Sequence, residues 1–328
     1  MNNLEKKILI IGLGSIGERH IRNLLSLDYK NIACLRRNIS TARTFDINNI
    51  TQFDSREEAV KWSPEYIIVC SPSNNHNSDL IFWSKHCINF LVEVPLHSSS
   101  EEMENSKDLL EKRGARILLG HNIRFHPALK KMKEIINSKI FGELLFIKSE
   151  FGEYLPDCHP WEDYRTRYEA RSDLGGGALL TSLHELDHSM FLAGKYKDAS
   201  GLIETLSLDI DCEDFVSIIA NHKSGVVSQI SLDFIQRDYQ RSTKLCFENG
   251  LVFWELKKKS LYAFDSNDKK TGWKNILNLE SYDFNQTYID QILYFLNEDF
   301  SEFNSLEDGL HILKLIKKIK DQNKLKRS

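Results

Sequence analysis

The sequence has few of the features that mark a membrane, secreted or nucleic-acid-binding protein. Its apolar runs, such as Ile8–Ile11, are far shorter than the roughly 20 residues of a membrane-spanning helix or the core of a signal peptide. The six cysteines are scattered and form no C-x-x-C pair. The 43 basic and 47 acidic residues nearly balance, which gives no electrostatic case for nucleic acid. We therefore expect a cytoplasmic protein with reduced thiols and with no nucleic-acid or membrane partner.

What remains is the composition of an ordinary globular protein. The chain has 328 residues, of which 41% are hydrophobic and 27% are charged. These values exclude disordered, collagen-like and coiled-coil classes. The length suits two domains.

The first 122 residues are expected to form a parallel sheet with intervening helices. Short apolar runs alternate there with segments of helical spacing. Because the runs are continuous rather than alternating, they indicate strands covered on both faces. The predicted strands are Ile8–Ile11, Ile32–Leu35, Tyr66–Cys70, Phe90–Val94 and Arg116–Leu119.

The pattern changes over residues 123–328, where we expect an α+β domain on an open, mainly antiparallel sheet. Pro127–Ser138 predicts a helix, since proline suits a first helical turn. Val226–Phe234 alternates apolar and polar side chains, and Asn249-Gly250 is a turn signal. A final helix over 306–320 can pack back on the first domain. One sheet face is expected to pair with a second copy of the chain, in a homodimer or homotetramer.

Gly12-Leu13-Gly14-Ser15-Ile16-Gly17 follows the first predicted strand and opens a helix. This context is the one that a dinucleotide-binding G-x-G-x-x-G motif requires. Gly12, Gly14 and Gly17 allow a tight turn and a close approach of the backbone to a pyrophosphate. Ser15 and Ile16 begin the helix whose N-terminus favours that anion. The motif predicts a Rossmann domain over residues 1–122.

The end of the second strand bears on the choice of cofactor. NAD-preferring sites usually place an acidic residue there, whereas this chain has Arg36 and Arg37. Arginines suit a 2′-phosphate through charge and paired hydrogen bonds. We therefore predict that NADP(H) is preferred, and NAD(H) remains possible.

Six segments, in order along the chain, resemble the Gfo/Idh/MocA family of oxidoreductases. The first is the glycine motif with its extension to His20. The others are Cys70-Ser71-Pro72-Ser73-Asn74-Asn75-His76, Glu93-Val94-Pro95-Leu96, Asn122-Ile123-Arg124-Phe125-His126-Pro127, Gly175–Leu180 with His184-Glu185-Leu186-Asp187, and Ser305–Leu310.

The resemblance implies an α/β protein, with a Rossmann domain followed by a second α/β domain. It implies hydride transfer to or from a sugar, a sugar nucleotide or a sugar of a nonulosonic-acid pathway. In this resemblance, Ser71, Pro72 and His76 border the dinucleotide. Glu93 and Pro95 shape its nicotinamide end.

The chain departs from the family pattern at the usual catalytic lysine, where it has Val94. Valine neither donates hydrogen bonds nor carries charge, so another group must take that role or the role is lost. His184 is the candidate general acid/base, because the pKa of histidine lies near neutrality. Asp187 lies beside it as an orienting or substrate-binding group, since i and i+3 share a helix face.

Two other functions remain open at this point. Without the lysine, the chain could be a cofactor-binding protein that has no redox activity. The segment His184-Glu185-Leu186-Asp187-His188 also matches the H-E-x-x-H pattern of zinc hydrolases. No third ligand follows at a known spacing, so we expect no metal.

The segment from Tyr154 to Arg165 is dense in aromatic and hydrogen-bonding side chains, and its two prolines predict an irregular loop. Aromatic faces pack against sugar rings, while charged groups bind hydroxyls, carboxylates or phosphates. The candidate substrate-binding residues are Arg124, His126, Tyr154, His159, Trp161, Tyr164, Arg165 and His188.

Overall fold

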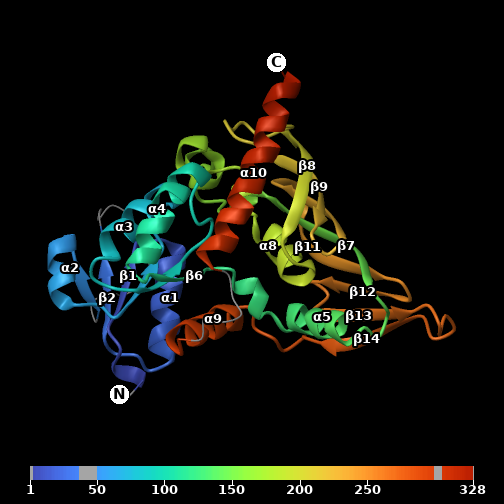
Figure 1. The fold of residues 1–328 in the computed structure, drawn as a ribbon, viewed down its shortest axis with the longest axis horizontal. Helices are drawn as coiled ribbons and strands as arrows, with labels where there is room; N and C mark the ends of the chain where they lie inside the picture. Colours follow the sequence, from blue (N-terminus) through green and yellow to red (C-terminus); the bar gives the residue numbers. More distant parts are fainter. Residues whose placement is uncertain (1–2, 37–49, 299–304, 328) are drawn as a thin grey trace. The chain divides into compact units, whose positions relative to one another are not determined.

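The computed structural model describes residues 3–36, 50–298 and 305–327 (Figure 1). The chain forms two compact units. The first comprises Met1–Asn122 and Thr287–Leu310, and the second comprises Ile123–Gln286 and His311–Ser328. The sequence prediction assigned residues 123–328 to the second domain and allowed only the final helix, 306–320, to pack back on the first; the returning segment instead begins at Thr287 and ends at Leu310. The return has a hydrophobic basis, because Phe295 and Leu296 lie in the core of the first unit.

The first unit contains a six-stranded parallel sheet in the order β3-β2-β1-β4-β5-β6. The expected Rossmann-type sheet is confirmed. Its two-sided burial explains the continuous apolar runs. Only β3, which is short and mostly exposed, has no counterpart in the sequence prediction. The strands are β1 (Ile8–Ile11), β2 (Ile32–Leu35), β3 (Thr51–Phe53), β4 (Tyr66–Val69), β5 (Asn89–Val92) and β6 (Arg116–Leu119).

Helices connect these strands, and two of them begin with a serine cap. Ser55 accepts a hydrogen bond from the Glu58 backbone N–H, and Ser99 accepts one from that of Glu102. Each cap satisfies a free N–H of the first helical turn. The helices of this unit are η1 (Asn3–Glu5), α1 (Ser15–Ser26), α2 (Arg56–Trp62), α3 (Ser73–Trp83), α4 (Ser100–Lys112) and most of α9 (Gln286–Leu296).

The second unit contains an eight-stranded sheet in the order β14-β13-β12-β11-β7-β10-β9-β8. Neighbouring strands are antiparallel except for β7 and β10, which confirms the mainly antiparallel sheet. The strands are β7 (Leu144–Tyr154), β8 (Tyr196–Glu204), β9 (Phe215–His222), β10 (Val227–Asp233), β11 (Ile235–Phe247), β12 (Gly250–Glu255), β13 (Ser260–Asp265) and β14 (Trp273–Asn278).

Helices α5 and α8 pack on one face of this sheet (Figure 1). Leu129 and Met132 of α5 join the core with Ile147, Leu245 and Trp254 of the strands. The opposite face, called the outer face below, carries the half-exposed side chains of Leu202 and Ile219. The remaining helices are η2 (Asn122–Phe125), α5 (Pro127–Ser138), α6 (Leu155–Cys158), η3 (Tyr164–Thr166), η4 (Tyr168–Ala170), η5 (Ser172–Leu174), α7 (Ala178–Thr181), α8 (His184–Ala193) and α10 (Leu306–Arg327).

Helix α10 begins in the first unit and continues in the second from His311. Within the described ranges, none of the helices combines the length and apolarity needed to cross a membrane.

Candidate functional site

The glycine motif forms the turn between β1 and α1, and its three glycines meet different surroundings. A Cβ on Gly12 would lie 2.6 Å from the Cys70 carbonyl oxygen, and one on Gly17 would lie 2.3 Å from that of Gly12. A Cβ on Gly14 would have no neighbour within 4 Å. The turn is therefore closely packed on its protein side and open at Gly14, next to the N-terminus of α1. This arrangement fits the pyrophosphate of a dinucleotide.

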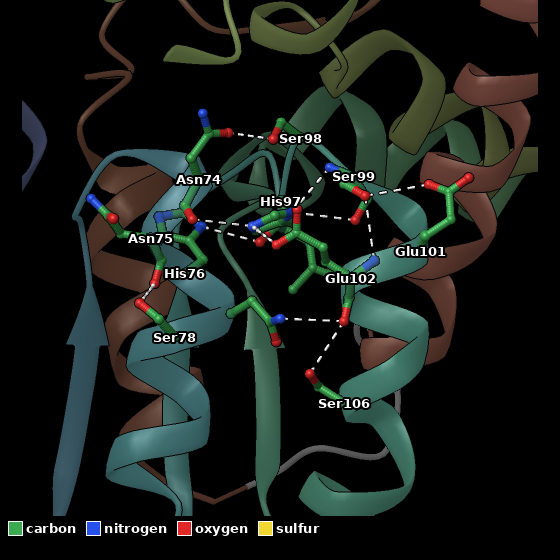
Figure 2. A network of polar contacts seen from close by, with 12 residues as sticks. Asn74, Asn75, His76, Ser78, His97, Ser98, Ser99, Glu101, Glu102 and Ser106 are labelled. Carbon is green, nitrogen blue, oxygen red and sulfur yellow. Dashed lines mark hydrogen bonds and ion pairs between the residues drawn. The ribbon is translucent and has the colours of Figure 1, made fainter. Parts of the chain in front are cut away.

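His76 ties together the loops that follow β4 and β5. Its Nε2 lies 2.7 Å from the Ser71 carbonyl oxygen, and its Nδ1 lies 3.0 Å from that of Pro95. The side chain is buried, and burial lowers its pKa. His76 thus positions these two loops rather than presenting its ring to a ligand. Figure 2 shows the neighbouring contacts, in which His97 bonds the Asn74 carbonyl oxygen at 3.2 Å.

A second buried histidine fixes the end of β5. Nε2 of His20, on α1, lies 2.6 Å from a carboxylate oxygen of Glu93. Glu93 also packs so closely on Gly120 that a Cβ there would lie 2.7 Å from its other oxygen. The partly exposed Val94 follows, joined to Pro95 by a cis peptide bond. The predicted nicotinamide end is thus held by buried polar contacts.

Ser71 and Pro72 immediately precede α3. Pro72 is the residue before the helix, and the Ser71 hydroxyl donates to Asp79 at 2.7 Å. At the end of β2, Arg36 donates to the Gln52 side-chain oxygen at 3.1 Å. Arg37, the other predicted 2′-phosphate ligand, lies outside the described residues. Both arginines stay candidates for the 2′-phosphate, and Arg36 is the one that the structure describes.

Helix α8 turns three of its polar side chains into the second unit. Arg124 makes two hydrogen bonds of 2.8 Å with the Asp187 carboxylate. Arg241 Nε lies 2.8 Å from Glu185 Oε1. His188 Nε2 lies 2.9 Å from the Ser149 hydroxyl. These contacts anchor α8 and leave His184, at its first position, partly exposed.

Three of the residues predicted to face the substrate have buried side chains, which argues against that role. Arg124 is buried and engaged by Asp187, so its guanidinium is not presented to a ligand. His188 is fully buried, and burial lowers its pKa to about 3. His126 caps α5 by accepting from the Ala128 N–H, and burial lowers its pKa to about 4. Asp187 can orient α8, but as the partner of Arg124 it does not extend toward a substrate.

The same contacts argue against the zinc-hydrolase hypothesis. That chemistry needs His184 and His188 as ligands on one face and Glu185 as a general base. Glu185 instead faces Arg241, and His188 is bonded to the Ser149 and Thr243 hydroxyls. The described ranges hold no cluster of three histidine, cysteine or acidic side chains that could bind a metal.

The loop expected after β7 contains two short helices, α6 and η3, and is irregular over residues 159–163. Tyr154 ends β7, and its ring lies under the Arg237 guanidinium at 3.6 Å. His159 packs edge-on against Trp161, which is 74% exposed. The Tyr164 hydroxyl accepts from the Asp209 N–H. His159 and Trp161 therefore remain candidates for contact with a sugar.

Arginines of this segment are paired with carboxylates two residues away. Arg165 bonds Asp163 and also Asp209, while Arg171 bonds Asp173. Arg167 forms the same kind of pair with Glu169. Arg165 is half-exposed and paired with Asp163 and Asp209, so its role as an anion ligand stays a prediction.

Sequence reasoning missed Arg241 and Glu153 on adjacent strands. Arg241 is buried beside Glu185, and Glu153 is half-buried near the end of β7. In the sequence, Arg241 stands in the polar run Arg237–Thr243, which reads as a surface strand. The missed signal is the alternation that places Arg241 on the same face as Thr243 and Leu245.

Two family models match consecutive parts of the chain. Residues 6–121 match the NAD-binding Rossmann domain of the GFO_IDH_MocA oxidoreductase family, and residues 129–253 match a C-terminal domain of the same family. The chain belongs to the Gfo/Idh/MocA family. Membership agrees with the fold and with the open turn at Gly14.

Curated relatives of this Gfo/Idh/MocA protein differ in named activity. A myo-inositol 2-dehydrogenase of Thermotoga maritima is 24% identical over 68% of this chain and 67% of its own length. The rhizopine catabolism protein MocA of Rhizobium meliloti is 23% identical over 57% of this chain, and 56% of its own length is covered. A 2,7-anhydro-N-acetylneuraminate hydratase of Mediterraneibacter gnavus is covered over only 33% of its length.

Solved structures share the fold over nearly the whole chain. A levoglucosan dehydrogenase in complex with NADH superposes with a TM-score of 0.85 at 15% identity, covering 99% of this chain and 98% of that one. The WlbA dehydrogenase of Bordetella pertussis, in complex with NADH and UDP-GlcNAcA, has a TM-score of 0.77 at 17% identity, with 98% and 97% covered. At these identities, the likeness establishes the fold of this Gfo/Idh/MocA chain.

Proposed function

We propose that this chain is an NAD(P)-dependent oxidoreductase that transfers hydride between the cofactor and a carbinol or carbonyl carbon of a sugar-like substrate. The observation that carries the proposal is the glycine turn, which is open at Gly14 and closed at Gly12 and Gly17. Family membership supports the same chemistry. Relatives named for inositol and levoglucosan support a sugar or cyclitol.

In this proposal the first unit holds the cofactor. The turn at Gly14 and the first residues of α1 would hold the pyrophosphate. When bound, a nicotinamide dinucleotide supplies the hydride donor or acceptor. His76 and His20 hold the loops after β4 and β5 in place through Ser71 and Glu93. Arg36 would bind a 2′-phosphate, which favours NADP(H).

His184 is the residue we propose to move the substrate hydroxyl proton. It stands at the start of α8, which is anchored by the pairs of Asp187 with Arg124 and of Glu185 with Arg241. A histidine in this role changes protonation near neutral pH. General acid–base groups typically contribute about 10²- to 10⁴-fold to turnover.

The test is His184→Ala, measured as kcat and KM with the cofactor saturating. We expect kcat to fall by about 100-fold or more, while dinucleotide affinity is unchanged. His86→Ala is the matched control, because His86 is an exposed histidine of the first unit. Wild-type turnover in His184→Ala would refute the assignment.

A cofactor-binding protein without redox activity remains the second candidate, because Val94 takes the place of the lysine. The two candidates differ in the response to Val94→Lys. If the wild type binds the dinucleotide but oxidises no polyol, and Val94→Lys creates turnover, the second candidate holds. Turnover by the wild type excludes it.

Two further features complete the proposal. The second-unit sheet pairs with a copy of itself in a homodimer or homotetramer, through the face that carries Leu202 and Ile219. The six cysteines are all free. Free thiols favour a reducing compartment, so we place the protein in the cytoplasm.

A further inference from the structure

The buried guanidinium of Arg241 has donors that nothing in the described part of the chain accepts. Its cation lies over the Phe151 ring at 4.4 Å, and its Nε lies beside Glu185. The side chain is only 9% exposed. Within the residues that the structure describes, neither Nη1 nor Nη2 has a hydrogen-bond acceptor. Nη1 and Nη2 are not among the buried polar atoms that lack a partner, so solvent reaches them and they can donate to a ligand.

An unused acceptor lies on the same face of the sheet. Phe151 is paired with Arg241 across β7 and β11, and Glu153 is the next residue of β7 on that face. The Glu153 carboxyl is half-buried and lies near the Cys158 thiol, which donates to the Tyr154 carbonyl oxygen at 3.6 Å. Burial raises its pKa despite the nearby Arg241 and Arg167. The Glu153 carboxyl interacts electrostatically with the Arg241 guanidinium.

An aromatic side chain borders these two groups. Tyr239 lies on β11 and packs edge-on against Phe151, with the ring centroids 5.7 Å apart. Tyr239 and Glu153 are both partly exposed, so the pair can be reached from solvent. A donor fork, a carboxylate and an aromatic ring are the groups that recognise hydroxyls and the apolar face of a sugar.

The charges around Arg241 disfavour an anionic ligand. Glu185 and Glu153 both interact electrostatically with its guanidinium. A ligand carboxylate or phosphate would therefore face one compensated cation and two carboxyl groups. An uncharged hydroxyl avoids this repulsion and still accepts from Arg241.

We infer that Arg241 and Glu153 form a subsite for adjacent hydroxyls of an uncharged sugar or cyclitol ring. Arg241 donates from Nη1 and Nη2, and Glu153 accepts from a hydroxyl. The inference rests on the proposed function and narrows its substrate to a neutral polyol at this subsite, rather than a sugar acid.

The experiment measures Kd and KM of the dinucleotide-loaded protein for myo-inositol, glucose and glucuronic acid. We expect the wild type to prefer a neutral polyol to glucuronic acid. Arg241→Met and Glu153→Gln should each raise Kd and KM for that polyol about tenfold or more, without changing the Kd of the cofactor. The control Arg171→Met removes an exposed arginine paired with Asp173 and should match the wild type.

The outcomes separate this inference from the proposed function. A folded wild type that binds no dinucleotide overturns the proposed function. A wild type that turns over a polyol, with both variants at wild-type KM, overturns the subsite alone. So does preferred binding of glucuronic acid, or a wild type that binds none of the three probes. If Arg241→Met unfolds because Glu185 loses its cation, Glu153→Gln and the double variant Arg241→Met/Glu185→Met provide the same test.

Discussion

His126 shows how burial decides the role of a single residue. Its ring packs on Trp254 and Tyr282, with centroids 4.9 and 5.1 Å away, and its Nδ1 accepts from the Ala128 N–H. A neutral imidazole satisfies this cap, whereas the cation does not. The motif at the start of α5 indicated a substrate-facing histidine, but packing from strands far along the chain makes it structural.

The lowered pKa of His126 predicts a loss of stability in acid. The unfolded state takes up the proton near its ordinary pKa of 6.5, and the folded state only near 4. Its contribution is therefore complete above pH 6.5 and is lost as the pH falls toward 4. The difference corresponds to about 3 kcal/mol.

His126→Asn removes the titration and keeps a capping side chain. Denaturant unfolding at several pH values measures the effect. We expect the free energy of unfolding of the wild type to fall more steeply than that of the variant between pH 6.5 and 4. Parallel curves for the two proteins would contradict the assignment.

At the scale of elements, the sequence predicted the strands whose formation depends on their own apolar residues. The five predicted parallel strands lie within two residues of their predicted ends, because buried strands have continuous apolar sequences. β14 was not predicted, since Trp273–Asn278 is an exposed edge strand without alternation. The sequence predicts a strand over Lys244–Phe247, but β11 begins at Ile235. Its additional residues are largely polar, and their burial depends on pairing with β7.

The same limit applies to the site. The glycine turn could be predicted because all its residues are contiguous. The role of Arg241 could not, since it depends on Glu185 of α8, which is distant in sequence. The histidines and arginines of the second unit were predicted as ligands from their chemistry alone. Their carboxylate and hydroxyl partners became evident only in the fold.

The turn between β1 and α1 gives a prediction at this scale. Gly14→Ala adds a Cβ into open space, at a φ of −81° that alanine adopts without strain. We expect its free energy of unfolding to change by less than about 1 kcal/mol, while dinucleotide affinity falls about tenfold or more. Gly12→Ala should instead destabilise by about 1–3 kcal/mol, because φ is +90° and the Cys70 carbonyl is too close. Calorimetric titration with the dinucleotide and denaturant unfolding distinguish the two variants. Wild-type dinucleotide affinity in Gly14→Ala would contradict a pyrophosphate site at this turn.

At the scale of the whole molecule, the outer face of the second sheet predicts self-association. Leu202 and Ile219 are each 47% exposed on it. Lys148 and Lys244 stand directly opposite each other on β7 and β11, which is unfavourable in an isolated sheet. A symmetric partner can cover the apolar groups and place its own carboxylates against the lysines.

Sedimentation velocity of the full chain tests this proposal. We expect a mass of twice the chain or a higher even multiple, and Ile219→Asp should shift it toward the monomer. Ile140→Asp, which changes an isoleucine that is 70% exposed in the turn after α5, should leave the mass unchanged. A monomeric wild type at micromolar concentration would contradict it.

The most direct test of the central claim is a fluorescence titration of the folded protein with NADPH and, in parallel, NADH. Turnover alone is a weaker test, because its absence can reflect the wrong substrate. We expect saturable binding of one dinucleotide per chain, tighter for NADPH, and we expect Arg36→Asp to reverse that preference. Binding of neither dinucleotide would contradict the proposed oxidoreductase and the cofactor-binding alternative together.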